Sequence, residues 1–188
     1  MDKNQLVLSW SGGKDSSLAL YRLLNEKKYE VRYLLTTVTR DFDRISMHGV
    51  RKELLLEQAR RASVEPDIAY ISKGANNKEY ERVMKEKIGK YLDEGIRTIA
   101  FGDLFLEDIR KYREDRMAGT GMTCIFPLWK ENTLDLARYF IKSGFRAIVC
   151  TVDPRKLGGE FAGRGDRRNE DENRGEQLPQ DKRDKALC

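Results

Sequence analysis

The segment Ser9-Trp10-Ser11-Gly12-Gly13-Lys14-Asp15-Ser16, near the start of the chain, gathers hydroxyl groups, two glycines and a lysine. An apolar run comes before it and a helical pattern follows it, so the glycines mark a strand-to-helix turn. Glycines let the backbone approach a ligand closely, and the first N–H groups of a helix have no intrahelical partner. Because the helix dipole and the ammonium of Lys14 add positive potential, the sequence predicts an anion-binding loop.

Two other interpretations of this turn can be weighed from its residues. It is not a Walker A loop, because Leu8 stands where the first glycine of that motif would be and Asp15 stands where Ser or Thr must follow the lysine. An ordinary turn, in which Asp15 or Ser16 merely caps the helix, requires neither the glycine pair nor the lysine. The anion-binding interpretation uses all of them, with hydroxyl donors at Ser9, Ser11, Ser16 and Ser17.

Length and composition limit the class of protein. The 188 residues, 39% of them hydrophobic, are enough for one domain with a core. A net charge of +5 permits binding to polyanions such as ATP or RNA, but the 36 basic and 31 acidic residues form no long basic block. The cysteines Cys124, Cys150 and Cys188 include no CxxC pair, which argues against a disulfide scaffold and a zinc or iron–sulfur site. With no signal-peptide pattern and no long apolar run, we expect a cytoplasmic protein without a membrane span.

Short β-rich runs alternate with longer segments of helical period along the chain. Strands are predicted at 5–10, 31–38, 67–72, 97–101 and 145–152, and helices at 16–26, 50–62, 77–94, 106–118 and 133–143. The helix at 50–62 carries Leu54, Leu55, Gln58 and Ala59 on one face. This alternation predicts a doubly wound α/β fold with a five-stranded parallel sheet, and a ligand crevice beyond the carboxyl ends of its strands. We expect one domain over 1–164 and a charged, disordered tail over 165–188.

Further polar residues follow other predicted strands. Asp103 lies at the end of the fourth strand, where active sites collect, and Arg110 lies on the helix after it. On that helix the spacing predicts exposed pairing of Glu107 with Lys111 and of Arg110 with Glu114, and exposed pairing is also expected for Asp108 and Arg113.

The loop after the second predicted strand contains His48, which is the only histidine of the chain. Its pKa range suits proton transfer, although a lone histidine is more often structural. The segment Phe126-Pro127-Leu128-Trp129 predicts either packing or a wall of an acceptor pocket.

The pattern Ser-Gly-Gly-x-Asp-Ser, matched by Ser11, Gly12, Gly13, Asp15 and Ser16, resembles the signature of the PP-loop ATP pyrophosphatases. Four later motifs extend this resemblance, and they are Met47-His48-Gly49-Val50, Gly102-Asp103-Leu104, Phe126-Pro127-Leu128-Trp129 and Gly144-Phe145-Arg146-Ala147-Ile148-Val149. With them, residues 5–164 resemble the diphthine–ammonia ligase-like (diphthamide synthase) branch of that superfamily. The resemblance implies the adenine nucleotide α-hydrolase fold. It also implies cleavage of ATP to AMP and pyrophosphate, and an activated carboxylate that ammonia attacks, with diphthine on elongation factor 2 as one candidate acceptor.

The same chemistry assigns roles to the residues already named. Attack of a carboxylate on the α-phosphate requires charge stabilisation on the departing pyrophosphate, which the loop N–H groups and Lys14 can supply. Mg²⁺ would be held by Asp15 or Asp103, and the acceptor carboxylate by Arg110. The full set of expected ATP-binding residues is Ser9, Ser11, Gly12, Gly13, Lys14, Asp15, Ser16, Thr36, Thr37 and Val38, and the expected catalytic residues are Lys14, His48, Asp103 and Arg110.

The far end of the chain departs from that family. After Phe161-Ala162-Gly163-Arg164 the expected segment Gly-Glu-Asn-Gly-Glu-Phe-His-Thr is absent, so we expect a chain that binds nucleotide but amidates its acceptor poorly. Three alternatives stay open: an ATP-binding regulatory protein without turnover, a tRNA-modifying PP-loop enzyme, and a non-enzymatic interaction module. Nucleic acid is the less expected partner, and a homodimer is compatible with the sequence.

Overall fold

A computed structural model describes residues 3–165. The chain divides into two units, one up to Lys130 and one from Glu131 onward, and each is described by itself. The predicted tail lies outside the described residues from 166 on. No helix within residues 3–165 has the length and apolar character needed to cross a membrane.

The first unit is built on a sheet of six strands, which are β1 (Asn4–Ser9), β2 (Tyr29–Thr39), β3 (Arg44–Ile45), β4 (Glu65–Ile71), β5 (Thr98–Ala100) and β6 (Thr123–Ile125). The parallel pairs join β4 to β2, β2 to β1, β1 to β5 and β5 to β6. The two-residue strand β3 pairs antiparallel with the end of β2. The predicted parallel α/β sheet is therefore confirmed, with β3 as an additional antiparallel strand.

One predicted strand was wrong. The segment 145–152 lies in the second unit and takes part only in an isolated bridge between Ile148 and Gly165. Its apolar pattern does not correspond to a buried ladder, because Ile148 is 66% exposed. The fifth parallel strand is β6 instead, whose three residues are too few to show a pattern in the sequence.

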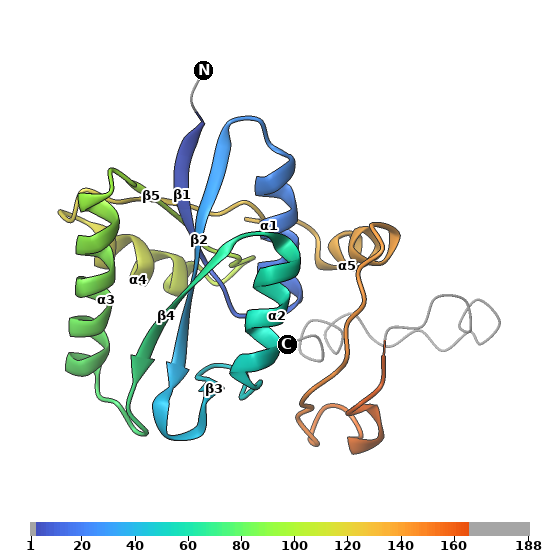
Figure 1. The fold of residues 1–188 in the computed structure, drawn as a ribbon. Coiled ribbons are helices and arrows are strands. Elements are labelled where there is room, and N and C mark those ends of the chain that lie inside the picture. Colours follow the sequence, from blue (N-terminus) through green and yellow to red (C-terminus); the bar gives the residue numbers. More distant parts are fainter. Residues whose placement is uncertain (1–2, 166–188) are drawn as a thin grey trace. The chain divides into compact units, whose positions relative to one another are not determined.

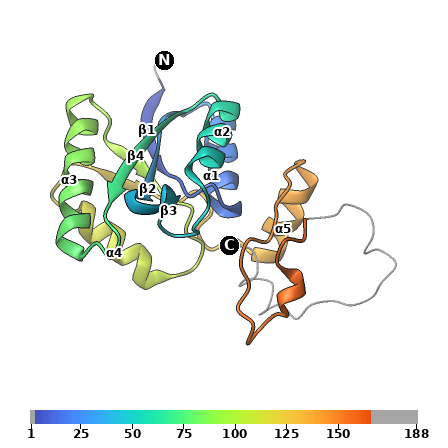
Figure 2. The ribbon, with the colours of Figure 1, turned by 60° about the horizontal axis from the view of Figure 1, so that its bottom comes forward.

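Four helices connect the parallel strands. They are α1 (Lys14–Asn25), α2 (Lys52–Ala62), α3 (Asn77–Asp93) and α4 (Glu107–Met117), all close to their predicted bounds. Figures 1 and 2 show α1 and α2 on one side of the sheet and α3 and α4 on the other. The doubly wound arrangement is thus confirmed.

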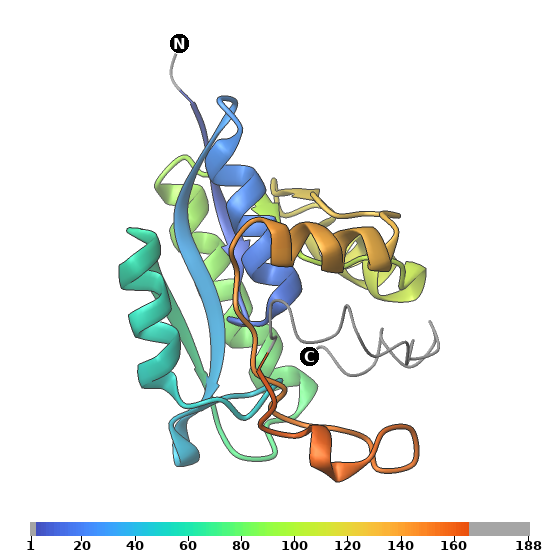
Figure 3. The same ribbon diagram turned by 90° about the vertical axis from the view of Figure 1, so that its right-hand side faces the viewer.

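The strand order places a topological switch point between β1 and β5. The chain leaves β1 toward β2 and β4, and then returns to form β5 on the other side of β1. At such a point the loops that follow the two strands diverge and leave a crevice at the carboxyl ends. Figure 3 shows β2 as a long strand, and the register shows that it continues past Ser9, the last residue of β1. The β1–α1 loop therefore lies beside the second half of β2.

The second unit contains α5 (Thr133–Lys142) and a single turn of 3-10 helix at Gly159–Phe161. Asn132 caps α5, because its side chain accepts hydrogen bonds from the backbone N–H groups of Leu134 and Asp135. The predicted stop at Gly144 is confirmed by its left-handed backbone, with φ of 88°.

A buried carboxylate ties α3 to the sheet. Asp67 on β4 is 8% exposed and accepts hydrogen bonds from Lys87, from Lys90 at 3.0 Å and from the hydroxyl of Tyr91 at 2.9 Å. Burial by itself would raise the pKa of Asp67, but these three donors outweigh it and leave the pKa below its ordinary value of 3.8. The carboxylate therefore stabilises the folded state while it is charged.

This network predicts an acid-sensitive contribution to stability. Asp67→Asn should lower the free energy of unfolding at pH 7 by about 2–3 kcal/mol, the scale of hydrogen bonds to a charged group. A carboxyl with a lowered folded-state pKa stabilises above its unfolded pKa and loses that effect as the pH falls through the folded pKa. The difference from wild type should thus shrink below pH 3.8. Urea unfolding at several pH values measures it, with Asp93→Asn on the exposed side of α3 as control; a pH-independent difference would contradict the assignment.

Candidate active site

The β1–α1 loop has the backbone that an anion site needs. Gly12 adopts a left-handed φ of 72°, and Gly13 is the N-cap of α1 without any side-chain cap hydrogen bond. The alternative in which Asp15 or Ser16 caps the helix was wrong, because the Ser16 hydroxyl donates to the Gly13 carbonyl at 3.1 Å instead. The first N–H groups of α1 are consequently left without a side-chain acceptor from the cap position.

Two hydroxyl groups brace the loop from within. Ser11 Oγ and Ser16 Oγ lie 3.1 Å apart, and Ser11 Oγ also accepts the N–H of Gly13 at 3.3 Å. A side chain at Gly13 would need space next to Ser11 Oγ, since a Cβ there would lie 3.3 Å from that atom. The two serines and the glycines therefore form one compact cradle.

Lys14 and Asp15 bring opposite charges to the mouth of this cradle. Lys14 Nζ lies 2.6 Å from Asp15 Oδ1, and the Lys14 side chain is only 8% exposed, whereas that of Asp15 is 32% exposed. The ammonium is thus held at the first turn of α1, where the helix dipole is also positive.

The second half of β2 supports the loop. The hydroxyl of buried Thr36 donates to the Trp10 carbonyl at 2.7 Å, and the Trp10 N–H donates to the Leu35 carbonyl at 2.7 Å. Val38 is fully buried and the Thr37 carbonyl accepts from Ser46. The Thr36 side chain therefore positions the loop.

Two side chains from the second β–α unit reach the glycines. His48 Nε2 lies 3.6 Å from the position that a Cβ on Gly13 would take. Gln58 on α2 donates from Nε2 to the Gly12 carbonyl at 3.2 Å. His48 was a predicted site residue, whereas Gln58 was not. The sequence did contain an indication of Gln58, because Gln58 is the one polar residue on the predicted helix face of 50–62.

The loop after β5 packs directly on the start of α1. A Cβ at Gly102 would lie 3.2 Å from both the backbone N and the Cα of Ser16, so only glycine fits there without a shift of backbone. This contact places Asp103, the next residue, beside the β1–α1 loop. The loops after β1 and β5 therefore meet at the switch point.

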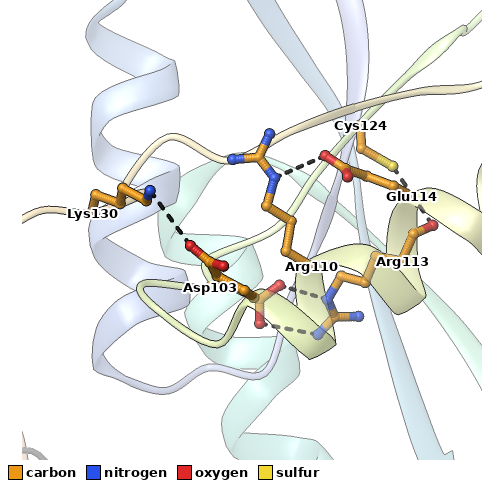
Figure 4. Close-up of polar contacts among 7 residues, drawn as sticks. Asp103, Arg110, Arg113, Glu114, Cys124 and Lys130 are labelled. Carbon is orange, nitrogen blue, oxygen red and sulfur yellow. Dashed lines mark hydrogen bonds and ion pairs between the residues drawn. The ribbon is translucent and has the colours of Figure 1, made fainter.

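Asp103 has a partner that the sequence did not indicate. Arg113 on α4 donates to both of its carboxylate oxygens, from Nε at 2.5 Å and from Nη2 at 3.3 Å (Figure 4). The expectation that Arg113 pairs at an exposed position was wrong, because its side chain is 27% exposed and lies 4.3 Å from the ring centre of Phe101. A separation of ten residues across a loop leaves no helical period to reveal such a pair.

Arg110 lies next to an aromatic cluster. Its Nε is 2.8 Å from Glu114 Oε1, as predicted (Figure 4). Its guanidinium carbon lies 4.7 Å and 4.8 Å from the ring centres of Phe126 and Trp129. Phe126 also stacks on Phe101 at 5.7 Å. These contacts show the packing role of the Phe126–Trp129 segment.

The expected pair of Glu107 and Lys111 was wrong. Lys111 contacts Asp115 at 2.7 Å, and Glu107 contacts Lys130 at 3.5 Å. Both arrangements are exposed, and such pairs contribute little to stability.

The two proposed metal ligands are each engaged by a cation, Asp15 by Lys14 and Asp103 by Arg113. Within residues 3–165 no group of three or more His, Cys, Asp or Glu side chains could hold a metal ion by itself. Mg²⁺ bound with a nucleotide takes most of its oxygen ligands from phosphates and water, so one or two carboxylates satisfy it. The exposed face of Asp15 fits that limited role.

Comparisons with known proteins identify one family and two solved structures that the chain resembles. Residues 4–123 match the family model described as the diphthamide synthase N-terminal domain. A predicted subunit of tRNA methyltransferase from Methanocaldococcus jannaschii is similar, with a TM-score of 0.50 and 18% identity over 76% of this chain and 78% of that one. The U34-tRNA thiolase NcsA from Methanococcus maripaludis, solved with its [4Fe-4S] cluster, gives a TM-score of 0.46 and 20% identity over 74% of this chain and 57% of that one.

No curated protein matches the sequence. The similarity to the Methanocaldococcus structure shows the fold alone, because the identity is low. The family match covers the β1–α1 loop, His48, Gln58 and the Asp103–Arg113 pair. The chain belongs to the family of the diphthamide synthase N-terminal domain, within the PP-loop superfamily.

Proposed function

We propose that this chain is an ATP-dependent, AMP-forming ligase that activates a carboxylate for amidation. The observation that carries the proposal is the β1–α1 loop, in which a helix N-terminus without a side-chain cap, two glycines and a lysine with a side chain only 8% exposed meet at a switch point. Such a loop suits the phosphates of ATP, which members of the superfamily bind. The resemblance to diphthine–ammonia ligases supports the choice of carboxylate and ammonia as co-substrates.

The reaction would proceed in two steps. An oxygen of the acceptor carboxylate attacks the α-phosphorus of ATP, the bond from that phosphorus to the bridging oxygen breaks, and pyrophosphate leaves with the electron pair. Ammonia then attacks the acyl carbon, loses a proton and expels AMP, which leaves an amide. The first step needs stabilisation of the pyrophosphate charge, and the second needs a proton acceptor.

The residues of the site can be assigned to these needs. Lys14 and the loop N–H groups would bind the pyrophosphate, with Ser9 and Ser11 as further donors, and Asp15 or Asp103 would hold Mg²⁺, which neutralises phosphate charge when bound. Strand residues Thr36, Thr37 and Val38 would contact the adenosine through backbone groups. His48 beside Gly13 would take the proton, and Arg110 would bind the acceptor carboxylate.

Pyrophosphate release from ATP and Mg²⁺ tests the proposal. We expect release that depends on ammonium and on a carboxylate acceptor, with elongation factor 2 carrying diphthine as the first acceptor to assay. AMP and pyrophosphate should form in equal amounts. Release that depends on tRNA instead would overturn the ligase assignment in favour of a tRNA-modifying enzyme, and ATP binding without any turnover would favour a regulatory protein.

A further inference from the structure

The peptide between Gly12 and Gly13 is the one peptide of the β1–α1 loop with glycine on both sides. Glycine on both sides removes the Cβ atoms that normally restrict rotation of a peptide plane. Gly12 has a φ of 72° and Gly13 has an extended backbone with ψ of 174°. A flip of this peptide would exchange the places of its carbonyl and its N–H group.

The direction of this peptide matters for an anion. An N–H group that faces a phosphate attracts it, and a carbonyl oxygen in the same place repels it. In the structure the Gly12 carbonyl points at α2, where Gln58 Nε2 donates to it at 3.2 Å. The N–H at the other end of the peptide donates to Ser11 Oγ at 3.3 Å. Each end of the peptide is therefore held by one side chain.

Gln58 also covers the Cα side of the same residue. A Cβ on Gly12 would lie 2.5 Å from Gln58 Oε1, so the carboxamide rests directly against the glycine. Gln58 comes from a different β–α unit, 46 residues further along the chain. Leu55 and Ala59, both fully buried on α2, fix the helix that presents it. The loop thus depends on α2 for its orientation.

We propose that Gln58 is a positioning residue for the nucleotide loop. Its carboxamide keeps the Gly12 carbonyl turned away from the phosphates, so that the loop presents N–H groups to them. The inference rests on the proposed binding of ATP at this loop and deepens it, because it assigns a role to Gln58, which is outside the set of residues proposed to bind the nucleotide.

The test compares Gln58→Leu, which removes the donor, with Gln5→Leu, the same change at the exposed start of β1. By calorimetry, Gln58→Leu should weaken binding of ATP and of inorganic pyrophosphate by about three- to tenfold, the range for one neutral hydrogen bond. Binding of adenosine, which has no phosphate, should stay at the wild-type level. In turnover assays the KM for ATP should rise by a similar factor while kcat changes less.

A second measurement needs no nucleotide. In the ligand-free protein, the amide NMR signal of Gly13 should broaden through conformational exchange in Gln58→Leu but not in Gln58→Lys, which keeps an N–H donor. A wild-type protein that binds no ATP would defeat the proposed function, whereas the NMR result would still decide the role of Gln58. A sharp Gly13 signal with unchanged pyrophosphate affinity in Gln58→Leu overturns the inference, and so does an equal loss of adenosine binding.

Discussion

Lys14→Ala is expected to weaken ATP binding by about 1.5–3 kcal/mol, or roughly 10- to 150-fold, the scale of a hydrogen bond to a charged group. The ammonium lies at the first turn of α1 with its side chain 8% exposed, so solvent screens its charge little. Calorimetry with ATP in the presence of Mg²⁺ measures the loss. Lys111→Ala is the matched control, because Lys111 is exposed on α4.

The Lys14 variant also leaves a charge behind. Asp15, which lies 2.6 Å from Lys14 Nζ, would keep its carboxylate at the mouth of the loop and repel the phosphates. The double variant Lys14→Ala, Asp15→Asn should therefore bind ATP better than Lys14→Ala alone if Asp15 holds no metal ion, and no better if it does. Wild-type affinity in the single variant would exclude this loop as the nucleotide site.

The part of the site that lies within one sequence segment could be predicted from the sequence. The strand, the glycine turn and the helix between Asn4 and Asn25 follow from local rules, which also indicate an anion site. The position of Asp103 at the end of β5 follows from the alternation of strands and helices, since parallel strands share one carboxyl edge.

The partners of these residues could not be predicted in the same way. Gln58 contacts Gly12 although the two are 46 residues apart in the sequence, and Arg113 on α4 contacts Asp103 in the loop before that helix. Both contacts therefore arise from the packing of separate elements. The strand at this edge of the sheet could not be predicted from the sequence either. The short strand β6 pairs with β5 through three residues, and nothing in so short a segment separates it from a loop.

Asp103→Asn is expected to lower turnover by more than about tenfold, a barrier change above about 1.4 kcal/mol, while ATP affinity changes less. Asp103 lies beside the β1–α1 loop because Gly102 packs on the first turn of α1. Asparagine keeps the shape and can still accept a hydrogen bond from Arg113. The melting temperature should therefore stay within about a few degrees of wild type.

The ion pair offers a way to separate catalysis from folding at this position. Asp103 and Arg113 are 19% and 27% exposed, so loss of either partner affects the same half-buried pair. If the pair only braces α4 against the loop, Asp103→Asn and Arg113→Gln should reduce turnover equally. If the Asp103 carboxylate acts on the reactants, Arg113→Gln should retain much more activity, because it keeps that carboxylate. Steady-state kinetics and thermal unfolding of both variants, with the exposed change Asp115→Asn as control, distinguish the two outcomes; equal loss of activity with lowered melting temperatures would assign the pair to structure and remove Asp103 from the catalytic set.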